Sequence, residues 1–275
     1  TITVSAGSAS GDLTLISGAV AEATDPSTVD IADLTVTLGS GGDSLDVSGT
    51  ADARELAIDL GAGDDTITLG GSLASASATL AGDILVGGDG TDTISVTSAI
   101  GNGQAAYTGM SGFEAVSFSN ALAAAATISN YQAGLNTVTL AAGANAGTLN
   151  LEAGSNTVNI GASLAGQLTV NDTGTATTDT LTIANTAAAA DDMGDTNDIV
   201  IGGFETVNLV TTNTGATEEQ NMGAITMTAD TGGSTTLNIS GTNAIDAAVI
   251  TADAVNASGL TAQATGTTTF EQSAA

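Results

Sequence analysis

Short stretches in which polar and hydrophobic residues alternate recur along the whole chain. A period of two is that of a β-strand with one buried face, because successive side chains point to opposite sides of a sheet. The clearest stretches are 34–38, 66–69, 93–96, 137–140, 157–160, 180–183, 206–209 and 236–239. Gly, Asn, Asp and Ser, which favour turns, separate them, and no segment has the period of a helix. The sequence therefore predicts an all-β protein with short strands.

The distance between successive strands is nearly constant. Steps of roughly ten residues separate Ile128, Val138, Leu149, Val158 and Leu168. Only slightly longer steps separate Ile225, Leu237, Val249, Leu260 and Phe270. Such steps indicate the rungs of a parallel β-solenoid or β-roll. β-Sandwich domains give strands at similar intervals and are the alternative, but the short strands and turns and the scarcity of aromatic residues favour the solenoid.

Charged residues divide the chain into three sections. The sequence contains 22 Asp and 8 Glu but only one basic residue, Arg54, so its net charge is −29. Residues 30–92 hold 11 of the aspartates, residues 93–171 hold none, and Asp returns at Asp172. We therefore expect an Asp/Gly-rich section at 1–99, a neutral Asn-rich β-solenoid section at 100–171 and a Thr/Ala-rich β section at 172–275. The boundaries are soft, and the three sections are compatible with one continuous body.

This composition excludes several classes of function. A field so negative repels phosphate backbones and anionic membranes, so we expect no nucleic-acid partner, and the chain has no run of 18 apolar residues that would predict membrane insertion. Hydrophobic residues make up 42% of the sequence, which argues against disorder. With no His, Cys or Lys, no base is available for nucleophilic catalysis. A carboxylate pair acting on sugars would need aromatic platforms that are scarce here, so we predict that the protein is not an enzyme.

One motif carries metal chemistry. Residues 87–95, Gly-Gly-Asp-Gly-Thr-Asp-Thr-Ile-Ser, fit the calcium nonapeptide G-G-x-G-x-D-x-U-x at each specified position. Residues 60–68 and 38–46 lack only its first glycine. These three segments resemble the repeats of the RTX family, whose fold is a right-handed parallel β-roll. The resemblance implies that Ca²⁺ is held in the turns of section 1–99.

The resemblance also implies the ligands of that calcium. Asp43, Asp65 and Asp92 match the ligand position of the family. Glycine turns can direct their carbonyls at a hard cation, so the further contributors that we expect are Gly41, Gly63, Gly90, Asp64 and Asp89. The copies depart from the family because they lie well apart along the chain, whereas the family's repeats follow one another in tandem. An acidic segment at 191–198 fits neither the nonapeptide nor the EF-hand loop, and we interpret it as a solvated loop.

A second repeated phrase is Gly-Phe-Glu, at 112–114 and 203–205. With the strand that follows it, this phrase resembles segments of bacterial S-layer proteins and related type I-secreted surface proteins. We expect its Phe to pack at the edge of a rung and its Glu to cap the rung or bind metal. The chain begins at Thr1 without Met or an export signal, which suggests a processed product or a segment of something longer.

These observations together predict a calcium-stabilised extracellular structural protein at the cell surface or in the matrix. We expect its copies to assemble into an S-layer-like lattice or filament, because the terminal rungs of a solenoid are unpaired edges. A cell-surface polysaccharide is a second candidate partner.

Two alternatives remain open. The chain is also compatible with a segment of a calcium-dependent bacterial adhesin or biofilm matrix protein, in which the solenoid is a spacer or a binding module. An ice-binding solenoid would need Thr-x-Thr pairs, such as Thr137/Thr139 and Thr180/Thr182, stacked on consecutive rungs. The pairs alternate with Asn or Ser and shift along the chain, which disfavours ice binding.

Overall fold

The computed structural model describes residues 2–5, 11, 14–16, 34–49, 56–73, 82–187, 193–194, 196–212, 220–261 and 269–273. The chain forms two compact units. Unit 1 comprises Thr1–Val96, Ile100–Ser117 and Ile128–Leu135, and unit 2 comprises Thr97–Ala99, Phe118–Thr127 and Asn136–Ala275. The compositional sections 1–99, 100–171 and 172–275 stay a prediction, because they describe charge and not contacts.

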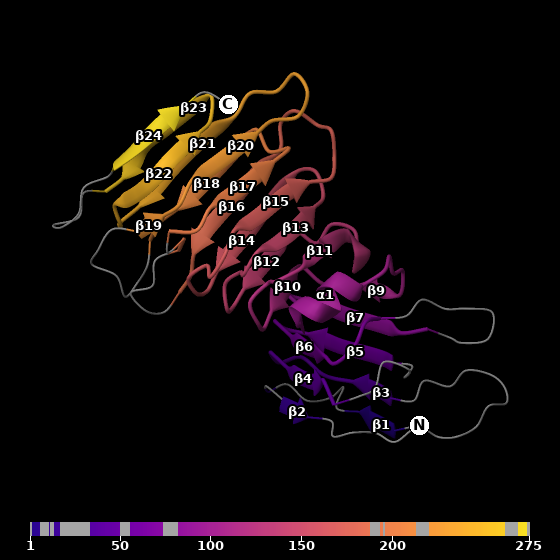
Figure 1. Ribbon diagram of the computed structural model, residues 1–275. Coiled ribbons are helices and arrows are strands. Elements are labelled where there is room, and N and C mark those ends of the chain that lie inside the picture. Colours follow the sequence, from indigo (N-terminus) through magenta and orange to yellow (C-terminus); the bar gives the residue numbers. More distant parts are fainter. Residues whose placement is uncertain are drawn as a thin grey trace. The chain divides into compact units, whose positions relative to one another are not determined.

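Unit 1 contains two parallel sheets (Figure 1). The strands of its first sheet, in spatial order, are β1 (Ile2–Ser5), β3 (Leu34–Thr37), β5 (Leu56–Ala62), β7 (Ile84–Asp89) and β9 (Met110–Ser111). The strands of its second sheet are β2 (Thr14–Ile16), β4 (Ser44–Val47), β6 (Thr66–Leu69), β8 (Thr93–Val96) and β10 (Ala115–Phe118). Neighbours in each sheet are alternate strands of the sequence, so the chain visits the two sheets in turn.

Unit 2 repeats this arrangement with two parallel sheets (Figure 1). Its first sheet contains β11 (Ala125–Thr127), β13 (Gly147–Leu151), β15 (Leu168–Asp172), β17 (Ile199–Gly202), β20 (Ile225–Thr228) and β22 (Ile245–Thr251). Both β19 (Gln220–Met222) and β24 (Thr269–Ser273) pair with β22. Its second sheet contains β12 (Thr137–Leu140), β14 (Ser155–Ile160), β16 (Thr180–Asn185), β18 (Thr206–Val210), β21 (Thr236–Gly241) and β23 (Ala254–Leu260).

The fold is therefore a parallel β-solenoid, as the sequence predicts. The strand pairings within both units are parallel, for example β4 with β6, β12 with β14 and β13 with β15, whereas a sandwich built from hairpins is antiparallel. Each step of about ten residues is half a coil, because Val138 pairs with Val158 in one sheet while Leu149 lies in the other. The expectation of a chain without helices is wrong at α1 (Ser98–Gly103) and at the 3₁₀ turn Ile128–Asn130. Both elements are too short to show a hydrophobic period.

Stacked aliphatic side chains form the core of each unit. In strands such as β4, β6 and β8 buried and half-buried residues alternate. The register places Leu45, Ile67 and Ile94 on top of one another, and each is at most 1% exposed. Burying such a side chain contributes about 1.5–3 kcal/mol. All eight strands that the alternation predicts are present, because the alternation reports directly which side of a strand faces the core.

Candidate metal centre

The three aspartates of the nonapeptide matches stack on successive coils of unit 1. Asp43, Asp65 and Asp92 each immediately precede a strand of the second sheet, and their exposed fractions are 3%, 1% and 0%. The wide spacing of these aspartates in the sequence is thus the length of one coil. Although the three segments are not in tandem along the chain, the structure places their aspartates in line on successive coils.

These aspartates form a series of hydrogen bonds that we call the carboxylate ladder, made of Asp43, Asp65, Asp92 and Glu114. The Asp43 N–H donates to Asp65 Oδ1 at 2.6 Å, and the Asp65 N–H donates to Asp92 Oδ1 at 2.9 Å. The Asp92 N–H in turn donates to Glu114 Oε2 at 2.8 Å. The carboxylates of Asp65, Asp92 and Glu114 therefore each satisfy a backbone amide of the preceding coil, which fixes the distance between coils.

In each of the two inner carboxylates of the ladder, one oxygen has no hydrogen-bond partner. Asp65 Oδ2 and Asp92 Oδ2 are buried and accept no hydrogen bond. Burial, reinforced by the charges of neighbouring carboxylates, raises the pKa of Asp65, and the same causes raise the pKa of Asp92 to about 6. The ladder is therefore a site that either takes up protons near neutral pH or attracts cations.

The other expected ligands lie on the turns of unit 1. Asp64 and Asp89 are exposed, and Asp64 Oδ1 accepts the Thr91 N–H at 2.9 Å. Gly63 and Gly90 have φ of 126° and 141°, and a Cβ on either would overlap the carbonyl oxygen of the glycine one coil before, Gly41 and Gly63 respectively. The glycines thus let the backbones of adjacent coils approach closely.

No three carboxylates of unit 1 converge in the part of the chain that the structure describes. The assignment of calcium to Asp43, Asp64, Asp65, Asp89, Asp92, Gly41, Gly63 and Gly90 therefore stays a prediction.

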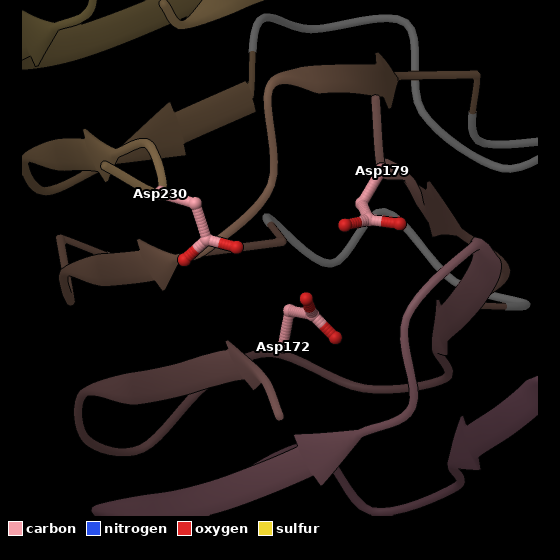
Figure 2. Close-up of side chains that lie close together, drawn as sticks. All are labelled: Asp172, Asp179 and Asp230. Atoms are coloured by element: carbon pink, nitrogen blue, oxygen red, sulfur yellow. The ribbon is translucent and has the colours of Figure 1, made fainter. Parts of the chain in front are cut away.

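Three other aspartates converge in unit 2, and we call them the aspartate cluster. Asp172, Asp179 and Asp230 each place one carboxylate oxygen within 4.8 Å of the other two (Figure 2). Asp172 ends β15, Asp179 precedes β16, and Asp230 follows β20. The cluster therefore lies where the chain crosses from the first sheet to the second, and such a group of three carboxylates can hold a metal ion.

Unequal turns bring these aspartates together. The crossings at 173–179 and 229–235 contain seven residues each, whereas the coil between them crosses through only three residues, 203–205. The two longer turns can therefore meet over the short one. Gly203 leaves room for this, because a Cβ there would lie 2.9 Å from Asp172 Cβ and 3.5 Å from Asp230 Oδ1.

Glu205, in the short turn, holds both longer turns. Its Oε1 accepts the Asp230 N–H and its Oε2 accepts the Asp179 N–H, both at 3.1 Å. Its side chain is 6% exposed, and the adjacent Phe204 is fully buried. Because one carboxylate binds the backbones of two aspartates from different coils, it positions two members of the cluster. Phe204 thus packs where its rung begins and Glu205 caps the backbone, as expected, while metal binding by the Glu stays a prediction.

Most carboxylate oxygens of the aspartate cluster lack a well-placed hydrogen-bond donor. Both oxygens of Asp172, Asp179 Oδ2 and Asp230 Oδ2 are buried and accept no hydrogen bond of good geometry. Asp179 is only 2% exposed, and its other oxygen accepts the Gly154 N–H at 2.6 Å. Burial, followed by the charges of Asp179 and Asp230, raises the pKa of Asp172, and nearby backbone amides offset this only in part. The sequence of unit 2 contains no basic residue that could pair with these carboxylates.

Sequence reasoning missed the cluster, although signals for it exist. Asp-Thr-Gly occurs at 172–174 and 230–232, and nowhere else in the chain. Asp179 begins Asp-Thr-Leu, which matches the Asp-Thr-Ile of residues 92–94. The acidic segment 191–198 lies partly outside the described residues, and within it Asp198 Oδ1 caps the Ala224 N–H at 2.7 Å.

Comparisons with known proteins leave this geometry as the main guide to function. No protein-family model matches the chain, and the searches of curated proteins and of solved structures found no match. In the described part of the chain, no helix is both long and apolar enough to cross a membrane.

Proposed function

We propose that this chain is a calcium-stabilised extracellular structural protein whose copies assemble into a lattice or filament. The observation that carries the proposal is the aspartate cluster, with its four buried carboxylate oxygens that accept no hydrogen bond of good geometry. Uncompensated buried charges are very costly. A bound dication would remove that cost and join coils that are not adjacent in the solenoid.

The chemistry of the cluster favours Ca²⁺ over other ions. All its ligand atoms are carboxylate oxygens, which suit hard cations, and the chain has no His or Cys to favour zinc. Calcium accepts flexible geometries with six to eight oxygens, and backbone carbonyls of the two long turns and water can complete such a shell. Magnesium requires a nearly regular octahedron, which two turns from separate coils are less suited to supply.

The remaining features of the chain suit a structural role. The described fold is a stack of short rungs, and the two tyrosines, Tyr107 and Tyr131, are buried and offer no platform for sugar rings. This weakens the case for an adhesin that binds glycans through aromatic stacking, while a surface polysaccharide bound through polar groups remains a candidate partner. The absence of His, Cys and Lys supports a role without catalysis.

Calorimetric titration with Ca²⁺ and Mg²⁺ tests the metal part of this proposal. We expect the double variant Asp172→Asn/Asp230→Asn to lose a calcium-binding event and the rise in melting temperature that calcium gives the parent protein. Asp246→Asn, which removes an exposed carboxylate from β22, is the matched control and should keep both. If calcium binds the double variant and the parent equally, the cluster does not hold calcium.

A further inference from the structure

One face of unit 2 lacks the charge that dominates the rest of the chain. It is the outward side of β12, β14, β16, β18 and β21, and we call it the Thr/Asn face. These five strands contain no charged residue, although the chain carries a net charge of −29. Their outward side chains are half-buried except for the exposed Ser155, because each lies between its neighbours on adjacent coils.

The register aligns these side chains in three rows. The central row consists of Thr137, Thr157, Thr182, Asn208 and Asn238. One flanking row consists of Ser155, Thr180, Thr206 and Thr236, and the other of Thr139, Asn159, Ala184, Val210 and Ser240. The amides are bonded along the rows: Asn238 Nδ2 donates to Asn208 Oδ1 at 3.1 Å, and Asn159 Nδ2 donates to Thr139 Oγ1 at 3.5 Å. The face is therefore an ordered surface of hydroxyl, amide and methyl groups.

The first sheet of unit 2 provides an internal contrast. Its outward rows are interrupted by Val200 and Gly202, and β15 ends in Asp172. Towards its other end, β22 carries the exposed Asp246 and β24 carries the exposed Glu271. Two copies that approached each other through this sheet would bring like charges together, whereas the Thr/Asn face imposes no such penalty.

We propose that the Thr/Asn face pairs with the same face of a second copy of this chain. This inference rests on the proposed function, because it names one of the surfaces through which the copies assemble. Strands of both copies repeat at about 4.8 Å, so the rows of one face match those of the other in spacing. Parallel, in-register rows of Thr and Asn can interdigitate as the sheets of a steric zipper do, and their amides stay bonded within each row. A two-fold axis makes the contact self-complementary and closed.

The competing occupant is an ice surface. In agreement with the sequence-based expectation, the Thr-x-Thr pairs of this face do not stack on consecutive coils. Thr137 and Thr139 lie beside Thr157 and Asn159. Thr180 and Thr182 lie beside Ser155 and Thr157. The amides of the central row are also bonded to one another and not free to order water. Both features favour a second copy.

Sedimentation velocity in calcium tests this inference with paired variants. Thr182→Glu/Asn208→Glu places two charges at the centre of the Thr/Asn face, and Thr148→Glu/Thr169→Glu places two charges at neighbouring outward positions of the first sheet. Like charges brought together in an interface are strongly unfavourable, so the first variant should associate at least about tenfold more weakly. The second variant should stay within about twofold of the parent protein, since its added charge remains in solvent.

The outcomes separate this inference from the proposed function. A parent protein that stays monomeric in calcium removes the proposed assembly. A parent protein that associates, with both variants equally affected, overturns only the Thr/Asn face. Ice shaping by a monomeric parent protein, abolished in the first variant, would assign the face to ice instead.

A second measurement does not depend on the Glu variants folding well. The chain has no cysteine, so Thr182→Cys and Thr169→Cys each give a single site for a pyrene label. We expect excimer fluorescence on calcium-driven association from the first position and none from the second. Excimer of equal intensity from both positions would contradict the proposal.

Discussion

The two Gly-Phe-Glu turns share their sequence and their local structure, yet only one of them lies beside an aspartate cluster. Gly112 and Gly203 have φ of 72° and 80°, and the phenylalanines that follow are both buried. Glu114 and Glu205 each accept the backbone N–H of an aspartate one coil earlier. In unit 1 the crossing one coil before Gly112 is residues 90–92, and it has only three residues. Its aspartate, Asp92, therefore stays in line with the other aspartates of the ladder.

In unit 2 the crossings before and after the short turn have seven residues each. Their extra length lets Asp230 meet Asp172 and Asp179, which flank a single crossing, across the middle coil (Figure 2). The phrase Gly-Phe-Glu therefore supplies a cap for a neighbouring turn and, through its glycine, space beside it, and the lengths of the neighbouring turns decide whether carboxylates converge there. Three predictions test this difference.

Gly203→Ala should have the largest effect. The new Cβ would press on Asp172 Cβ in a left-handed conformation, and overpacking of this kind costs about 1–3 kcal/mol in addition to about 1–2 kcal/mol for the conformation. We also expect calcium affinity to fall at least about tenfold, which corresponds to about 1.4 kcal/mol. Urea unfolding and calorimetry measure the two quantities.

Gly232→Ala is the matched control for that prediction. Gly232 has φ of 90°, but no atom of the described residues lies within 4 Å of the position of its Cβ. The variant should lose only the conformational cost and bind calcium normally. If it loses as much affinity as Gly203→Ala, backbone strain and not space governs the cluster.

Glu205→Gln should have an intermediate effect. Gln has one acceptor oxygen for the two N–H groups that Glu205 binds, and losing a buried hydrogen bond to a charged group costs about 1.5–3 kcal/mol. Glu114→Gln keeps an acceptor for the single N–H of Asp92 and should cost less than about 1 kcal/mol. Unfolding in chelator isolates this difference from metal binding, and equal losses would show that Glu205 does not hold two turns.

The dependence of stability on pH should show the smallest effect, and it concerns the ladder. Burial and neighbouring charges raise the pKa of Asp92 to about 6 in the folded state, above its unfolded value of about 4. Protonation therefore stabilises the fold fully below about pH 4, and this contribution is lost as the pH rises through about 6. We expect urea unfolding in chelator to show that Asp92→Asn reduces the gain in stability between about pH 7.5 and about pH 5.

Asp46→Asn gives the opposite control. Hydrogen bonds from the Ser48 side chain and backbone lower the pKa of Asp46, so its contribution is present above its unfolded pKa and lost as the pH falls through its folded one. Removing Asp46 should therefore leave the stabilisation on mild acidification intact or enlarge it. A variant Asp92→Asn with an unchanged pH profile would show that the ladder does not take up protons.

The sequence by itself determined the strands and their buried faces. Alternation at 66–69 or 137–140 predicts a strand and its buried face, because every second side chain of a strand points to the same side of the sheet. The nonapeptide motif identified Asp43, Asp65 and Asp92 as equivalent positions, and the structure stacks them on successive coils. Capping by the Glu of Gly-Phe-Glu was also predictable, since it follows from the position of that residue before a strand.

Only the tertiary structure decided which carboxylates meet. Asp172 and Asp230 lie two coils apart in the chain, and their proximity depends on two long turns, the missing side chain of Gly203 and the double hydrogen bond to Glu205. The sequence also does not show the length of a coil or the register between strands. A regular step from one strand to the next is compatible with half a coil and with a whole coil. A local pattern reports the direction of each side chain, whereas the convergence of carboxylates depends on how turns of unequal length stack across coils.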